Sequence, residues 1–331
     1  MYLVELVGGK RFAATTGESL LEAAARGGVN LPYSCKTGRC STCKCKVLSG
    51  ETHALHAETG LTEQEQSEGW VLSCARSAKT DVVLEVDDLG GIDLPLAQTW
   101  PCRISEINRL APDVVQVLLR LPPTADFHFI PGQYIDIIGP NAIRRSYSLA
   151  NANFASKFLE LHIRAVEGGA MSNYWFNQAK PNDLLRLNGP LGTFCLRETA
   201  NIDLIFLATG TGIAPVKAML ESMIYLESDQ RPRNVKVIWG GRHPQDLYMN
   251  VTDISGDHTY IPVLSRPSGG WAGSRGHVQD VLLKMAPDFA NAAVYACGSD
   301  AMIHSARIRL VEAGLPASRF YSDAFVSSGM N

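Results

Sequence analysis

Four cysteines have the residue type and spacing of a metal site. Three come from one short segment and the fourth follows further along the chain: Cys35, Cys40, Cys43 and Cys74. The pattern C-x4-C-x2-C…C supplies the four thiolates that a 2Fe–2S cluster requires. Three ligands from one tight loop need small or flexible residues between them, which Gly38, Ser41 and Thr42 provide. We expect this loop to turn backbone N–H groups toward the sulfurs.

Two other kinds of cysteine site compete with this interpretation. Structural zinc sites often contain a C-x2-C pair, but they usually combine two such pairs or mix cysteine with histidine, and no second pair accompanies Cys74. A disulfide framework fits poorly with a start that lacks a secretory signal. Cys45 follows the loop on a predicted strand that turns it away from Lys44 and Lys46, so we expect it to be a packing residue.

Composition limits the class of protein. The 331 residues suggest two or three domains, and 46% of them are apolar, which is enough for several cores. The net charge of −3 makes nucleic acid or an anionic membrane an improbable partner. We expect no membrane span and a reduced, cytoplasmic protein in which Cys102, Cys195 and Cys297 are buried apolar residues.

Residues 1–88 are predicted to form a small domain around the cysteine loop. Tyr2–Val7 and Arg11–Thr15 alternate like a hairpin with Gly8 and Gly9 at its turn, and Glu18–Arg26 has the apolar face of a short helix. The remaining elements are expected as a strand over 44–48, a helical turn capped by Thr62, the return of the chain over 70–74 and a closing strand over 81–86.

The rest of the chain divides by its periodicity. Residues 89–98 contain glycine and proline without periodicity, which predicts a linker. Residues 99–197 have an all-β pattern, with strands expected over 114–119, 134–138 and 159–165. Residues 198–331 alternate between strands at 204–208, 235–239, 260–264 and 294–297 and helices at 214–226, 277–285 and 299–313. This alternation is typical of a doubly wound nucleotide-binding domain.

One strand of the middle region carries Arg145-Ser-Tyr147-Ser148. Alternation places Arg145 and Tyr147 on one face and Ser148 on the other. An isolated R-x-Y-S tetrapeptide is usually an ordinary strand. Here Gly169-Ala-Met-Ser172 and Gly210-Thr-Gly-Ile-Ala-Pro215 follow it in order, and this succession resembles the ferredoxin–NADP reductase superfamily.

The resemblance implies roles for these residues in binding FAD. Arg145 would pair with the FAD pyrophosphate, Tyr147 would pack beside the flavin, and the Ser148 hydroxyl would approach N5, the atom that accepts hydride. The second segment, with Gly169, Met171 and Ser172, resembles a helix start that offers N–H groups to the pyrophosphate.

The segment between the strand at 204–208 and the next helix is glycine-rich. Gly210 and Gly212 flank Thr211 and would let the backbone approach a pyrophosphate, and Pro215 suits a first helical turn. The segment lacks the G-x-G-x-x-G fingerprint, so an ordinary strand-to-helix turn is the alternative. In the superfamily that it resembles, this is the nicotinamide-domain motif.

Two later segments complete the resemblance. Cys297-Gly298 ends a predicted strand and resembles the segment that approaches the nicotinamide, although a buried cysteine at a turn is equally plausible from spacing alone. A terminal aromatic often covers the flavin face in this superfamily, which makes Phe325 the candidate; core packing at an edge strand is the competing interpretation.

The fold implied is a multidomain α+β and α/β chain. It would contain a β-grasp ferredoxin domain with plant-type 2Fe–2S ligation (1–88), a linker (89–98), an antiparallel β-barrel FAD domain (99–197) and a doubly wound parallel-sheet NAD domain (198–331). Electrons would pass from NADH to FAD and then singly to the cluster.

The sequence identifies the electron path more specifically than it identifies the protein that accepts the electrons. Further segments resemble the NADH-driven reductases of 3,6-dideoxyhexose biosynthesis, which serve a sugar dehydrase; these are residues 120–125, 131–136, 214–217, 295–299 and 321–325. The reductase components of multicomponent oxygenases share the same domain order and are the alternative. A redox-sensing protein that keeps the fold is a third possibility.

Specificity for NADH over NADPH has no decisive signal in the sequence. Arg242, Arg266 and Arg275 could reach a 2′-phosphate but are more often solvated surface charges. Asp246 could accept a hydrogen bond from a ribose hydroxyl or cap a helix. The resemblance favours NADH.

Overall fold

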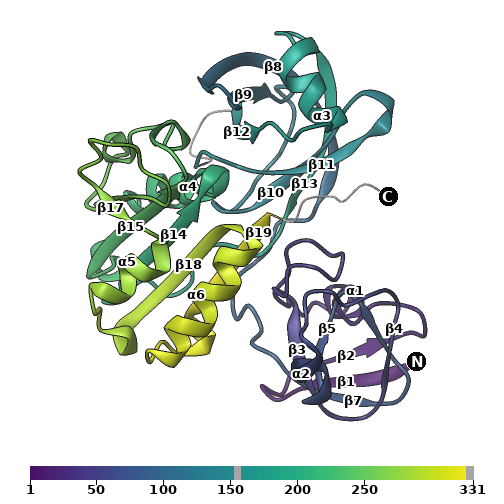
Figure 1. Ribbon diagram of the computed structural model, residues 1–331. Helices are drawn as coiled ribbons and strands as arrows, with labels where there is room; N and C mark the ends of the chain where they lie inside the picture. The colour runs from purple at the N-terminus through teal and green to yellow at the C-terminus, as the bar shows by residue number, and fades with distance from the viewer. Residues whose placement is uncertain (153–157, 326–331) are drawn as a thin grey trace. The chain divides into compact units, whose positions relative to one another are not determined.

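The computed structural model describes residues 1–152 and 158–325 (Figure 1). Among the described residues, contacts divide the chain into two compact units: Met1–Leu94 together with Asp323–Phe325, and Pro95–Ser322. In the part of the chain that is described, no helix is both long and apolar enough to cross a membrane.

The first unit is built on a five-stranded sheet of order β2-β1-β7-β3-β5. Its strands are β1 (Tyr2–Leu6), β2 (Arg11–Ala14), β3 (Lys44–Ser49), β5 (Trp70–Leu72) and β7 (Val82–Glu85). β1 and β7 pair in parallel, while the other pairs are antiparallel. A separate two-stranded sheet joins β4 (Thr52–Ala54) and β6 (Arg76–Ala78).

Two short helices accompany this sheet; Thr62 caps one of them as predicted, and the other begins at Leu20 rather than at the predicted Glu18. Ser19 and Thr62 cap α1 (Leu20–Arg26) and α2 (Glu63–Ser67), each in a capping box with a glutamate three residues later. α1 buries Leu20, Leu21, Ala23 and Ala24 in the core of the unit.

The second unit begins with a six-stranded antiparallel sheet of order β11-β10-β13-β8-β9-β12. The strands are β8 (Gln98–Ala111), β9 (Val114–Arg120), β10 (Tyr134–Ile138), β11 (Arg144–Ser148), β12 (Phe158–Arg164) and β13 (Leu184–Leu191). A bridge between Leu149 and Leu161 brings the chain beyond β11 to β12, so the two edges of the sheet meet and it closes as a barrel. α3 (Ala170–Asn173) continues into a π-helical turn over Tyr174–Gln178.

The last sheet has the order β17-β16-β15-β14-β18-β19 and is parallel from β17 to β18 (Figure 1). Apart from the end of β19, this sheet belongs to the second unit. The strands are β14 (Asp203–Thr209), β15 (Asn234–Gly241), β16 (Thr259–Leu264), β17 (Ser274–Arg275), β18 (Ala292–Ser299) and β19 (Phe320–Phe325). The helices are α4 (Ile213–Met223), α5 (Val278–Lys284) and α6 (Asp300–Glu312). The strand order reverses between β14 and β18, and ligands of such sheets bind at the carboxyl ends of the strands where this reversal occurs.

The segment predicted to be a linker is partly held by the first unit. Leu89 donates its N–H to the Asn30 carbonyl at 3.0 Å, and the Asn30 amide donates to the Ile92 carbonyl at 3.2 Å. The boundary between the units falls at Leu94 and Pro95. The domain limits given above remain predictions.

Candidate functional site

The loop that carries the first three cysteines has an unusual backbone. Lys36, Gly38 and Ser41 all have positive φ, at 55°, 75° and 59°. A Cβ on Gly38 would collide with the Ala57 carbonyl, so only glycine fits there. Gly60 donates its N–H to the Gly38 carbonyl at 2.9 Å, and the Ser41 hydroxyl bonds the Gly60 carbonyl. The loop is therefore shaped by its own turns and by the segment that ends at Gly60.

The four predicted ligands form two pairs of sulfurs. Cys43 Sγ lies 3.2 Å from Cys74 Sγ, and the Cys35 N–H donates to Cys40 Sγ at 3.4 Å. The Thr37 N–H donates to Cys35 Sγ at 3.3 Å, as expected for a loop that turns N–H groups toward the sulfurs. Two pairs of thiols fit two iron atoms with two protein ligands each.

The thiols within each pair affect each other's ionisation. The contact between the Cys35 and Cys40 side chains lowers the pKa of Cys35 to about 4 and raises the pKa of Cys40. Cys43 likewise lowers the pKa of Cys74, while its own pKa is raised. In each pair one thiol is therefore more acidic than the other, and a bound metal would require both as thiolates.

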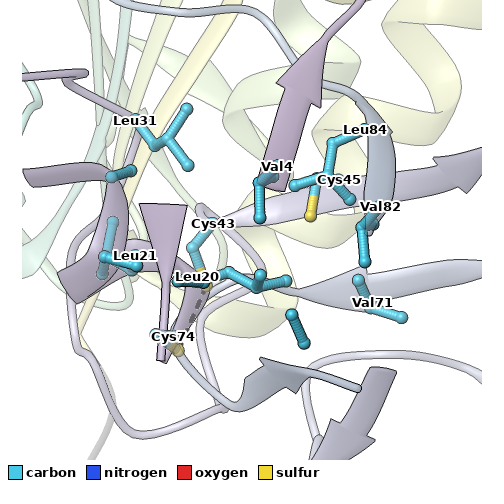
Figure 2. Packing of buried hydrophobic residues seen from close by; sticks show 14 of the residues in the cluster. Val4, Leu20, Leu21, Leu31, Cys43, Cys45, Val71, Cys74, Val82 and Leu84 are labelled. Atoms are coloured by element: carbon cyan, nitrogen blue, oxygen red, sulfur yellow. Dashed lines mark hydrogen bonds between the residues drawn. The ribbon is translucent and has the colours of Figure 1, made fainter. Parts of the chain in front are cut away.

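Cys45 belongs to the core, as predicted. It is fully buried, and Figure 2 shows it beside Val4 and Leu84, whereas Cys43 and Cys74 lie next to each other. Burial raises the pKa of the Cys45 thiol to about 12. Cys102, Cys195 and Cys297 are also buried.

The R-x-Y-S segment forms β11, at one edge of the barrel sheet. Arg145 pairs with Ile137 of β10, and Tyr147 pairs with Ile135. The Arg145 guanidinium is exposed and bonds only the Arg144 carbonyl, at 2.8 Å, without an ion pair among the described residues. It therefore remains free to bind a phosphate group.

The Tyr147 and Ser148 side chains on this strand are more enclosed than the Arg145 guanidinium. The Tyr147 hydroxyl accepts a hydrogen bond from Trp175 Nε1 at 3.0 Å, and burial raises its pKa to about 12. Ser148 is only 8% exposed. A strand with a free cation, a fixed aromatic ring and a sheltered hydroxyl fits the FAD group that the sequence predicts.

The second predicted FAD segment fits in part. Gly169 precedes α3, and the Ser172 hydroxyl accepts the Val166 N–H at 2.9 Å. Met171, however, is 3% exposed, and its sulfur lies where a Cβ on Gly139 would be. Its side chain fills the barrel core, so a cofactor contact at Met171 is restricted to the backbone.

The glycine-rich segment lies where β14 ends. Gly210–Gly212 form a 3₁₀ turn, and Pro215 occupies the first turn of α4, as predicted. A Cβ on Gly212 would collide with the Cys297 carbonyl, and one on Gly298 would collide with the Thr209 hydroxyl. The structure therefore brings the Gly210–Gly212 turn and the Cys297-Gly298 segment into backbone contact at the strand reversal.

Arg164 lies beside this turn and was not predicted. Its Nη1 lies 3.0 Å from the place of a Cβ on Gly210, and its Nη2 donates to Asp246 Oδ1 at 3.2 Å. The sequence signal that could have indicated Arg164 is the alternation of polar and apolar residues along β12. Asp246 is a cap, because its Oδ2 accepts the N–H groups of Arg242 and His243 at 2.7 and 2.9 Å. The suggestion that it binds a ribose is therefore disfavoured.

The remaining predicted site residues are Cys297, Thr211 and Phe325. The Cys297 side chain is fully buried in the core of the parallel-sheet region, and Thr211 is half-buried at the turn. Phe325 ends the described chain and is 39% exposed. The contacts of Cys297 and Phe325 with nicotinamide and flavin remain predictions.

Family models match three successive parts of the chain. They are a 2Fe-2S iron-sulfur cluster binding domain at residues 6–79, an oxidoreductase FAD-binding domain at 101–195 and an oxidoreductase NAD-binding domain at 206–307. The CDP-6-deoxy-L-threo-D-glycero-4-hexulose-3-dehydrase reductase of Yersinia pestis is 40% identical over 96% of both chains. The chain belongs to the ferredoxin–NADP reductase superfamily, in the group with an N-terminal 2Fe–2S domain.

Other members of the superfamily serve different partners. The electron transfer component of the xylene/toluene monooxygenase of Pseudomonas putida is 33% identical over 96% of this chain and 91% of its own. The crystal structure of an Amycolatopsis cytochrome P450 reductase covers 99% of this chain and 100% of its own, with a TM-score of 0.76 and 29% identity. This reductase is thus an NAD(P)H-dependent oxidoreductase that carries FAD and a 2Fe–2S cluster. The predicted fold class and cofactors are confirmed.

Proposed function

We propose that this reductase delivers electrons from NADH to the dehydrase of 3,6-dideoxyhexose biosynthesis, in the cytoplasm. The observation that carries the proposal is the 40% identity over 96% of both chains to the Yersinia dehydrase reductase. An oxygenase component is the second candidate, because an oxygenase electron transfer component is 33% identical over nearly the same length.

We assign the electron path to the residues described above. FAD, when bound, accepts a hydride from NADH and passes on single electrons, which is the form that a 2Fe–2S cluster takes. Arg145 would bind the FAD pyrophosphate, with the N–H groups at Gly169 and Ser172 contributing, while Tyr147 orients the flavin. The turn at Gly210–Gly212 would bind the nucleotide pyrophosphate through backbone N–H groups. Arg164 lies beside the turn with its charge paired to Asp113 and Asp246.

The four cysteines would hold the cluster, and the surrounding N–H groups would stabilise its negative charge. The Thr37 N–H already points to Cys35 Sγ at 3.3 Å, and the Gly38 N–H lowers the pKa of Cys74. Hydrogen bonds to the sulfurs are one of the factors that set the potential of such clusters.

Ser148→Ala is expected to keep FAD but to slow its reduction by NADH about 10-fold, because a sheltered hydroxyl near the reacting atom is lost. Arg145→Ala should instead weaken FAD binding by roughly 10- to 100-fold through the lost charge-assisted contact. Stopped-flow bleaching of the flavin and FAD titration of the apoprotein separate the two effects. Parental reduction rates in Ser148→Ala would remove Ser148 from this step.

The partner is tested with purified components. NADH oxidation is measured with the reductase alone, with a pyridoxamine-dependent sugar dehydrase and its substrate, and with an aromatic-ring oxygenase component and its substrate. We expect product formation coupled to NADH oxidation with the dehydrase, at least about 10-fold faster than with the oxygenase. Faster coupled turnover with the oxygenase would favour the second candidate.

A further inference from the structure

Strand β12 is buried on both faces. Leu159, Leu161 and Ile163 point into the barrel core. The residues between them and at the end of the strand, Glu160, His162 and Arg164, point to the opposite side, where Glu160 and His162 are only 9% and 7% exposed. Buried polar side chains need partners, and the NAD-binding part of the same unit supplies them.

Glu160 connects β12 to helix α4. Lys217 on α4 donates to Glu160 Oε2 at 2.9 Å, to the Ala150 carbonyl at 2.9 Å and to Glu221 Oε1 at 2.6 Å. Gln116 donates to Glu160 Oε1 at 2.8 Å. Burial opposes the charge on Glu160, but His162 and Lys217 outweigh it and lower the pKa of Glu160 to about 2.

His162 connects β12 to the segment after β15. Its Nε2 lies 2.8 Å from Glu160 Oε1, and its Nδ1 lies 3.0 Å from the Tyr248 hydroxyl. An ionised carboxylate can only accept, so Nε2 carries a hydrogen. Burial keeps the pKa of Tyr248 well above its usual value, so its hydroxyl stays protonated. Both ring nitrogens of His162 therefore have a hydrogen-bonding partner.

The chain of contacts continues to the nucleotide turn. The Tyr248 ring packs edge-on against Trp239, with centroids 5.1 Å apart at an interplanar angle of 86°. Trp239 Nε1 donates to the Gly210 carbonyl at 2.9 Å. The polar face of β12 is therefore linked, through Tyr248 and Trp239, to the turn that we assign to the nucleotide.

We propose that Glu160, His162 and Tyr248 are positioning residues that fix the NAD-binding part on the flavin barrel for hydride transfer. An apolar interface tolerates sliding, whereas directional hydrogen bonds between buried groups select one arrangement. Hydride transfer needs such selection, because a displacement of about 1 Å can cost on the order of 100-fold in rate. The inference rests on the proposed nucleotide turn at Gly210–Gly212.

The test uses the full-length holoprotein with Tyr248→Phe, which removes one oxygen and keeps the ring, and Glu160→Gln, which keeps the shape. At saturating NADH, flavin reduction should slow about 10-fold. The isotope effect with NADH deuterated at nicotinamide C4 should rise, because the hydride step becomes more limiting. FAD and iron content should equal those of the parent. In the same holoprotein, amides of β12 and α4 should exchange hydrogen faster in both variants than in the parent.

Two matched controls make the same chemical changes at contacts that do not join the barrel to the parallel-sheet region. Tyr174→Phe removes a hydroxyl that lies 3.1 Å from Asp183 inside the barrel region. Asp203→Asn neutralises a buried carboxylate that pairs with Arg233 at 2.9 Å, at the start of β14. Both controls should reduce their flavin at the parental rate with the parental isotope effect.

The proposal is overturned if Tyr248→Phe and Glu160→Gln keep the parental rate and isotope effect, or if the controls slow the reaction equally. Unchanged hydrogen exchange at β12 and α4 would overturn it as well. If the assignment of the Gly210–Gly212 turn to the nucleotide is wrong, the result is different: Gly212→Ala would then reduce its flavin with NADH at the parental rate.

Discussion

Cys74→Ser is expected to eliminate the 2Fe–2S cluster and, with it, reduction of the native partner. Cys74 Sγ lies 3.2 Å from Cys43 Sγ, so one of the two sulfur pairs loses a thiolate. Electron transfer to the partner should fall by about 100-fold or more, because cluster binding and the folding of its loop depend on each other. Reduction of FAD by NADH should be unaffected. Iron and acid-labile sulfide contents and the EPR signal of the reduced protein measure the loss.

Cys45→Ala is the matched control. Cys45 is fully buried and packs in the core, so its replacement should leave the iron and sulfide contents unchanged. A full cluster in Cys74→Ser, or loss of iron only in Cys45→Ala, would contradict the ligand assignment.

Gly212→Ala is expected to lower the rate of flavin reduction by NADH by about 100-fold. The added methyl group would collide with the Cys297 carbonyl, so the turn must move away from the segment with which it forms the predicted nucleotide site. Both cofactors should remain bound and should still be reduced by dithionite, which needs no nucleotide site. Stopped-flow reduction with NADH and with dithionite separates the two routes.

Gly269→Ala is the control for this substitution, because a Cβ there meets nothing within 4 Å and the backbone lacks a positive φ. It should behave like the parent. Parental reduction by NADH in Gly212→Ala, or equal losses in both variants, would show that the close approach at Gly212 has no role in nucleotide binding.

Local signals in the sequence predicted the elements well. Thr62 was predicted to cap a helical turn, and it caps α2 in a capping box with Glu65. Runs of β-branched residues predicted β9, β10 and β12 to within a residue or two of their observed ends. The cysteine spacing predicted a 2Fe–2S domain, which the family model at residues 6–79 confirms, while the four ligands stay a prediction.

Other features depend on contacts between distant segments and escaped prediction. The π-helical turn after α3 and the small sheet of β4 and β6 have no periodic signature. Asp246 caps its own 3₁₀ turn and at the same time holds Arg164 beside Gly210, a pairing that only the folded chain reveals. The burial of the Met171 side chain beside Gly139 also depends on such contacts, and the predicted contact of its segment with FAD through N–H groups stays a prediction.

The parallel pairing of β1 with β7 determines the order in which the first unit can be completed during synthesis. Val4 and Leu6 need Val82 and Leu84 as neighbours, so the centre of the sheet stays open until β7 has left the ribosome. All four cysteine ligands precede β7 in the chain. The thiols are therefore made before the sheet that shelters them can close, and iron and sulfide can reach them while the nascent domain is still open.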